Sequence, residues 1–226
     1  MKVILQTPTP SIQDSISFYK QLQFTQLGEK PIFTDGKMLI EVNEDRFARP
    51  GVKLLSPSWV NVAHELEAIT KVTKIDGGNL IGDGSGTWIY LIETTDFPEI
   101  PSDCSASLLG TNFGLSIETI DIGFAQKIWN LLGFNTAQGS AEQGWISLSD
   151  DNGNSISLMV PNCCPHLFLN PSISYFNGTQ NPSIIEKIRS TGIPIAEEIT
   201  HFNKEGIVDN IILSDPGNIG FFIFND

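Results

Sequence analysis

The chain has 226 residues, of which 40% are hydrophobic and 17% are charged, and its formal net charge is −13. This length allows one large domain or two of about 110 residues, and the composition is ordinary for a soluble globular protein. The acidic balance argues against nucleic-acid and anionic-membrane partners, which need a basic surface.

The ends and the cysteines point to an intracellular setting. The apolar run from Met1 to Leu5 is too short for a signal peptide, so we expect a cytoplasmic protein. The three cysteines, Cys104, Cys163 and Cys164, include no CxxC spacing, which argues against a disulfide framework. We expect free thiols, and a soft-metal role for Cys163 and Cys164 is the alternative.

Hydrophobic periodicity predicts four modules with one order of elements: a strand, a helix and several further strands. The first strands are expected at residues 3–7, 52–55, 113–117 and 167–175. The helices are expected at residues 11–22, 59–72, 121–132 and 182–190. The last strands are expected at residues 38–42, 88–92, 155–160 and 219–224, with a further strand at 145–148 and a hairpin through 203–206.

The helices are predicted from apolar side chains that recur on one face. In the first helix these are Ile12, Ile16, Tyr19 and Leu22, and in the second they are Trp59, Val62, Leu66 and Ile69. Ser11 or Asp14 suits the beginning of the first helix.

An internal repeat is the strongest signal in the chain. Tyr19 and Phe24 are matched by Trp129 and Phe134, at a constant offset of 110 residues. Turns that combine Asp and Gly precede strongly apolar strands, and they begin at Asp35, Asp83, Asp151 and Asp215. We expect two domains, residues 1–100 (modules 1–51 and 52–100) and 108–226 (modules 108–162 and 166–226), joined by a linker at 101–107.

The helix end Ser17-Phe18-Tyr19 with Phe24 behind it, its echo from Trp129 to Phe134, and the closing pattern from Asp215 to Ile219 carry a resemblance. On these features the chain resembles the vicinal oxygen chelate superfamily, which includes glyoxalase I, bleomycin-resistance proteins and extradiol dioxygenases. The resemblance implies an α+β fold of four βαβββ modules in two tandem domains, each forming a curved trough.

The resemblance also implies where a metal would bind. Metal-dependent members place one ligand on the first strand of a module and a carboxylate on its last strand. The first-strand position falls near Ile4, Leu54, Gly114 and Ile173, and the last-strand position falls on Glu41, Tyr90, Ser157 and Phe221. Only Glu41 matches, so we expect no cofactor, and a divalent metal held in an unusual way is the alternative.

Glu41 is the candidate catalytic residue. It alternates with Ile40 and Val42, so it faces away from them. Lining a trough, it would be a partly buried carboxylate suited to general-base work, and the sole candidate metal ligand. The alternative is a solvent-facing residue or one paired with a lysine.

Six further residues are candidate substrate-binding groups. Gln6 shares a face with Ile4 in the first strand, and Trp88 and Tyr90 share a face on which a planar ligand could stack. Trp145 and Ser157 are the counterparts in the second domain, and the alternative for the aromatic residues is a place in the core. His201, expected in a strand, is the one histidine that could point into a trough.

Three hypotheses follow. The leading one is a metal-independent trough that binds a small, partly aromatic or apolar molecule, in a monomer or homodimer. The second is a glyoxalase- or dioxygenase-like enzyme, a lyase, isomerase or oxidoreductase with an unusual ligand set. The third is a non-catalytic structural or interaction protein whose troughs are filled by side chains. One fold supports many chemistries, so the resemblance does not decide among them.

Overall fold

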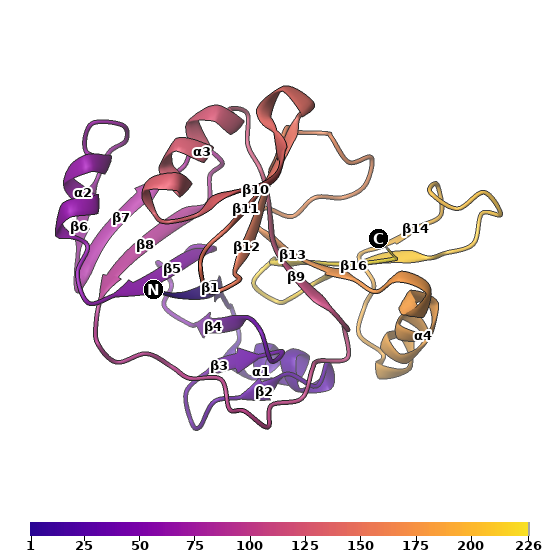
Figure 1. Cartoon of the computed structure of the whole chain (residues 1–226). Helices are drawn as coiled ribbons and strands as arrows, with labels where there is room; N and C mark the ends of the chain where they lie inside the picture. Colours follow the sequence, from indigo (N-terminus) through magenta and orange to yellow (C-terminus); the bar gives the residue numbers. More distant parts are fainter. Residues whose placement is uncertain (226) are drawn as a thin grey trace.

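The computed structural model describes residues 1–225, which form two eight-stranded mixed β-sheets and four α-helices (Figure 1). Sheet A comprises β1 (Lys2–Pro8), β2 (Thr25–Gln26), β3 (Ile32–Thr34), β4 (Leu39–Asn43), β5 (Gly51–Ser56), β6 (Thr73–Ile75), β7 (Gly78–Gly82) and β8 (Trp88–Glu93). Sheet B comprises β9 (Asn112–Glu118), β10 (Asn135–Ser140), β11 (Trp145–Ser149), β12 (Ser155–Met159), β13 (Ser172–Phe176), β14 (Glu197–Ile199), β15 (Asn210–Ser214) and β16 (Gly220–Phe224).

The two sheets have the same topology. Their strand orders are β2-β3-β4-β1-β5-β8-β7-β6 and β10-β11-β12-β9-β13-β16-β15-β14. In each sheet the first strands of two modules pair antiparallel at the centre, and each also pairs in parallel with the last strand of its own module. The predicted α+β fold of four βαβββ modules is therefore confirmed.

The helices are α1 (Ile12–Gln21), α2 (Val60–Leu66), α3 (Ile122–Leu131) and α4 (Asn181–Thr191). Ser11 is the N-cap of α1 and its hydroxyl accepts a hydrogen bond from the Asp14 amide, while Asp121 caps α3 in the same way through the Phe124 amide. Among residues 1–225, none of the helices is both long and apolar enough to cross a membrane.

The predicted second helix, residues 59–72, was too long. α2 ends at Leu66, and the next residues make tight turns in which Ile69 and Thr70 both donate to the Leu66 carbonyl. Thr70, Val72 and Thr73 are β-branched and lose side-chain freedom in a helix, which favours the turn and the strand that follows. Ile69 is therefore exposed rather than on the buried face.

Two other boundaries in the second half differ from prediction. The first strand of module four begins at Ser172 rather than residue 167, since Pro171 has no amide hydrogen to donate to a neighbouring strand. The turn aspartate of module three is Asp150, whose carboxylate accepts from the amides of Asn152 and Asn154, rather than Asp151. The linker at 101–107 lies between β8 and β9, and the division into domains 1–100 and 108–226 stays our proposal.

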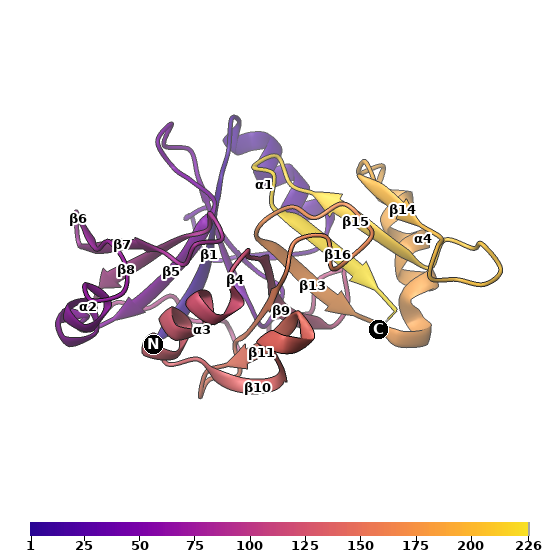
Figure 2. The ribbon, with the colours of Figure 1, turned by 90° about the horizontal axis from the view of Figure 1, so that it is seen from above.

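One hydrophobic core is shared by both sheets. The repeat pairs have nearly the same geometry in it: Tyr19 and Phe24 meet edge to face at 5.3 Å and 84°, and Trp129 and Phe134 at 5.3 Å and 86°. Phe221 of β16 packs against the Phe18 ring of α1, which brings the first and last modules together. Figure 2 shows β16 and β15 running beside α1.

Three of the turn aspartates are buried and accept hydrogen bonds from the other sheet's half of the chain. Asp35 accepts from the Tyr175 hydroxyl and the Asn112 amide, both at 2.6 Å. Asp83 accepts from the Trp129 indole at 2.9 Å. Asp215 accepts from the hydroxyls of Thr7 at 2.7 Å and Tyr19 at 2.8 Å. Buried carboxylates need such donors, so these contacts fix how the halves meet.

Asp215 lies at the closest approach of the two halves. A Cβ on its neighbour Gly217 would lie 2.0 Å from the Pro8 carbonyl oxygen, so only glycine fits there. Burial raises the pKa of Asp215 to about 6, while hydrogen bonds from Thr7, the Ile219 amide and Tyr19 oppose the shift. Burial and the nearby Asp215 carboxylate raise the pKa of Tyr19, which keeps this hydroxyl a donor.

The stability of the protein should depend on pH through Asp215. Its pKa in the folded protein, about 6, exceeds the ordinary 3.8, so the folded state holds the proton more tightly than the unfolded chain. This contribution is complete below the ordinary pKa and is lost as the pH rises through about 6. We expect the stability of the wild type relative to Asp215→Asn to fall by up to about 3 kcal/mol between roughly pH 4 and pH 7.

The measurement is urea unfolding of both proteins across that range. Asp151→Asn, at an exposed turn position, is the control and should follow the wild type. If the free energy of unfolding of the wild type, relative to that of Asp215→Asn, stays constant or grows with pH, the raised pKa of Asp215 does not control the stability.

Candidate functional site

The face of sheet A opposite the shared core, here called trough A, collects the side chains that alternate with the core residues. Val52 and Leu54 are fully buried in the core, so Lys53 between them points into trough A. The same alternation places Glu41 of β4 in the trough between buried Ile40 and Val42. The predicted module-two position, Leu54, was therefore wrong by one residue.

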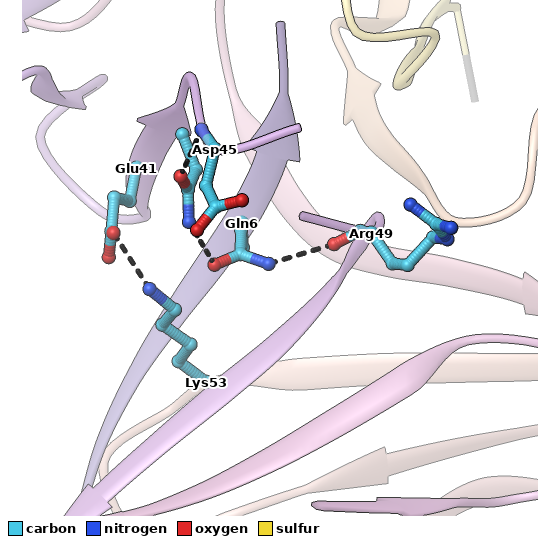
Figure 3. A network of polar contacts seen from close by, with 6 residues as sticks. Gln6, Glu41, Asp45, Arg49 and Lys53 are labelled. Atoms are coloured by element: carbon cyan, nitrogen blue, oxygen red, sulfur yellow. Dashed lines mark hydrogen bonds and ion pairs between the residues drawn. The ribbon is translucent and has the colours of Figure 1, made fainter. Parts of the chain in front are cut away.

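Glu41 and Lys53 form the charged centre of trough A. The Lys53 Nζ lies 2.7 Å from the Glu41 Oε1, and the two side chains are 16% and 25% exposed, respectively (Figure 3). A place in the trough and a pairing with a lysine were alternatives for Glu41, and in the structure both hold. Lys53 was not among the predicted site residues, although the alternation from Val52 to Leu55 contains the signal.

The charged pair lies beside an apolar floor. Ile4, Ile32, Leu39 and Leu55 form a small hydrophobic cluster separate from the main core, and Phe97 and Ile100 pack on it from the segment after β8. A cavity of about 270 Å³ remains between these groups. It is lined by Ile4, Lys30, Ile32, Glu41, Lys53, Leu55, Ile92, Asp96 and Pro98. A larger cavity of about 340 Å³ lies away from the trough, near Trp59 and Asp150.

Gln6 lies directly beside Glu41, since the two are partners in the β1–β4 register. Its side chain is 2% exposed and is held at both ends: Nε2 donates to the Arg49 carbonyl at 2.8 Å, and Oε1 accepts from Asn43 at 3.0 Å (Figure 3). The amide thus anchors the loop between β4 and β5. Its role in binding substrate stays a prediction.

Trp88 and Tyr90 of β8 also face trough A, with ring centroids 6.1 Å apart. The Tyr90 ring lies over Gly51, where a Cβ would come within 2.9 Å of Cε2. Burial raises the pKa of Tyr90, while the Gln6 amide opposes the shift, so the hydroxyl stays protonated near neutral pH. Gln6, Glu41, Trp88 and Tyr90 therefore share one face of sheet A, and of the four Glu41 lines the 270 Å³ cavity. Substrate binding by these residues stays a prediction.

Sheet B carries a polar counterpart, here called trough B. Ser147, Ser157, Ser116 and Ser172 are register partners across four adjacent strands. Ser157 is thus placed in the trough, and Trp145 lies on the same face one row along, paired with Met159. The Ser116 and Ser174 hydroxyls are hydrogen-bonded to each other at 2.7 Å. The structure brings the two predicted residues of this half together.

Aromatic side chains occupy the other side of trough B. Phe222 faces the trough, whereas Phe221, the predicted last-strand position, faces the core. Phe168 packs on Phe222 at 5.0 Å, and the His166 ring lies 5.1 Å from both Phe222 and Phe224. This half of the trough is filled by the chain itself.

His201 does not lie in a strand, which corrects the prediction. β14 ends at Ile199, and His201 is exposed in the loop that follows, where its ring is tilted by 55° against Phe202 with centroids 4.2 Å apart. Phe202 is exposed as well, so no buried face continues past Ile199. The structure does not bring His201 to the other candidate residues.

No protein-family model matches this chain, and no curated protein matches it by sequence. Solved structures match it over nearly its whole length. The 2,3-dioxygenase LapB from Pseudomonas sp. KL28 has a TM-score of 0.55 at 14% identity, covering 96% of this chain and 89% of that chain. A variant of homoprotocatechuate 2,3-dioxygenase from B. fuscum has a TM-score of 0.60 at 13% identity, covering 98% and 71%.

A third structure, 2,2',3-trihydroxybiphenyl 1,2-dioxygenase from Sphingomonas wittichii strain RW1, has a TM-score of 0.56 at 12% identity and covers 100% of this chain and 91% of that chain. All three are extradiol dioxygenases, so the predicted resemblance is confirmed for the architecture. The chain has the vicinal oxygen chelate fold. At these identities the likeness concerns the fold alone, and the chemistry must be argued from this chain's residues.

The side chains at the ligand positions of this vicinal oxygen chelate fold do not fit a divalent metal. Trough A offers Glu41, but its partner there is the Lys53 ammonium, which repels a cation, and the Gln6 amide is already hydrogen-bonded. Trough B offers serine hydroxyls and Phe222 at these positions. Within residues 1–225, no three His, Cys, Asp or Glu side chains gather as a metal group would require.

Removing the charged pair as a whole should cost little stability. Glu41→Leu alone leaves the Lys53 charge beside the apolar floor, and we expect a loss of about 1–3 kcal/mol, reduced by partial exposure. Glu41→Leu combined with Lys53→Met replaces the pair by apolar groups and should lie within about 1 kcal/mol of the wild type. Urea unfolding measures both. A double variant less stable than either single variant would mean that the pair exists to stabilise the fold.

Proposed function

We propose that the protein is a metal-independent small-molecule-binding protein, and that trough A is its binding site. The observation that carries the proposal is the 270 Å³ cavity between the Glu41–Lys53 pair and the aliphatic floor. Its volume is close to the lower end of ligand pockets, roughly 300–1,000 Å³, so the ligand is small. Apolar lining with a few convergent polar groups is typical of such sites.

The ligand body is apolar, because Ile4, Ile32, Leu55 and Ile92 line the cavity. The segment after β8 borders one side of the cavity through Asp96 and Pro98. Trough B supports a different role for the second half. Its aromatic filling favours a structural or interaction function there, without a ligand.

Methyl-region NMR of the full chain against a varied library of small apolar and aromatic compounds tests the proposal. We expect saturable shifts at Ile4, Ile32, Leu55 and Ile92. Ile92→Phe fills the cavity and should abolish them, whereas Ile69→Phe, at an exposed position outside the cavity, should bind normally. No saturable shift with any compound, or shifts confined to sheet B, would refute the proposal.

Metal should have no effect on this binding. A metal that binds only the folded protein raises its melting temperature, because it stabilises the folded state by RT ln(1 + [metal]/Kd). We expect Mn²⁺, Fe²⁺ and chelator each to leave the melting temperature within about 1 °C and ligand affinity unchanged, because the Lys53 ammonium lies where a cation would bind. A concentration-dependent rise with one ion, lost in Glu41→Gln, would instead favour the metal-dependent alternative.

A further inference from the structure

The charges that line the cavity of trough A come in opposite pairs. Lys53 and Glu41 lie inside at a Nζ–Oε1 distance of 2.7 Å, and Lys30 and Asp96, both exposed, line its edge. The four groups sum to zero formal charge. Within residues 1–225, Lys53 and Glu41 make no hydrogen bonds from their charged groups except the one to each other.

Both members of the inner pair have unused bonding capacity. An ammonium has three donors and a carboxylate has about four acceptor positions, and only one of each is used here. A charged pair in an apolar setting repays its desolvation only when these remaining positions are satisfied. The pair therefore has positions left over to bind a further molecule that supplies both a donor and an acceptor.

The sign of each charge limits which molecule this can be. A ligand with only a carboxylate would engage Lys53 and face the Glu41 carboxylate, and a ligand with only an ammonium would engage Glu41 and face Lys53. Either one leaves a like charge a few ångströms away in a low-dielectric site. A zwitterion satisfies both partners at once, and its zero net charge avoids repulsion by a chain of charge −13.

We propose that trough A binds a free aliphatic α-amino acid of about the size of leucine, an inference that rests on the proposed binding function. Its carboxylate accepts from Lys53 and its ammonium donates to Glu41. An α-amino acid carries both charges on one carbon, which suits a pair whose own charged atoms touch. Its side chain lies on the floor of Ile4, Ile32, Leu55 and Ile92, and these aliphatic residues favour an aliphatic group.

Four compounds that share a 3-methylbutyl group test the inference by isothermal titration of the full chain: L-leucine, 4-methylpentanoate, 3-methylbutylamine and 3-methylbutanol. They present both charges, the carboxylate alone, the ammonium alone, and neither. We expect leucine to bind at least about tenfold more tightly than each of the others, since each charge-assisted contact to a partly buried partner is worth about one to two factors of ten.

Variants assign the contacts. Lys53→Met and Glu41→Gln should each weaken leucine binding at least about tenfold. Lys74→Met and Glu67→Gln make the same charge changes at exposed positions outside the cavity and should bind as the wild type. Circular dichroism confirms that each variant is folded, and the comparison of four compounds on the wild type stands even where a variant is not.

The outcomes separate the two proposals. If 4-methylpentanoate, 3-methylbutylamine or 3-methylbutanol binds with an affinity within about threefold of that of leucine, the inference of a zwitterionic ligand is wrong and the proposed binding function stands. Leucine binding unchanged in both Lys53→Met and Glu41→Gln leads to the same conclusion. Failure of all four compounds, together with a saturable hit elsewhere in the NMR library, also overturns the amino-acid inference alone. Failure of every compound in both experiments overturns the binding function with it.

Discussion

Each central strand of this fold must bury one face against a single core that both sheets share. Leu5, Ile40 and Leu54 are fully buried on that face, which leaves only their sequence neighbours free to form a site. Because side chains alternate strictly along a strand, the residues between them, Gln6, Glu41 and Lys53, are committed to the trough together. The site in trough A is thus a consequence of how the core is built.

The buried aspartates hold this arrangement in place. Asp35, Asp83 and Asp215 begin the turns before three of the last strands, and each accepts hydrogen bonds from a Tyr, Trp, Thr or Asn side chain of the other half of the chain. A carboxylate without those donors would be costly to bury, so the turns also specify how the halves dock. This contact between halves occurs at the turns of modules one, two and four. In module three, Asp150 instead accepts hydrogen bonds within its own turn.

The two halves share this framework but carry different side chains in their troughs. In trough A the ligand positions of the fold carry Glu41 and the trough centre carries Lys53, over a floor that leaves a cavity. In trough B the equivalent rows carry serines, and His166, Phe168 and Phe222 fill the remaining space. A pair of opposite charges cannot replace a metal, but it can recognise a ligand that carries both charges, which gives the altered residues a coherent chemical role.

Much of this could be predicted from the sequence where local physics decides the outcome. The echo of Tyr19 and Phe24 in Trp129 and Phe134 predicted the repeat, because the chain packs edge to face in the same way after α1 and after α3. Alternation placed Glu41 on the face opposite Ile40 and Val42. The predicted positions Leu54 and Phe221 each lie one residue from the trough-facing Lys53 and Phe222, because loops of unequal length shift the register between modules.

His201 was misplaced for a different reason. Its neighbours Ile199, Thr200 and Phe202 are residue types common in strands, but tertiary packing ends β14 at Ile199. Whether a trough is open, as in sheet A, or filled, as in sheet B, likewise depends on contacts between segments far apart in sequence, such as Phe97 with the floor of trough A. No local pattern carries that information.

A crystal structure of the full chain, grown with a saturating trough ligand and with Mn²⁺, and measured at the manganese absorption edge, tests whether trough A binds its ligand without a metal. We expect ligand density between the Glu41–Lys53 pair and the Ile4, Leu55 and Ile92 floor, with no anomalous peak within bonding distance of Glu41. An anomalous peak coordinated by Glu41, with Lys53 turned away, would contradict this expectation.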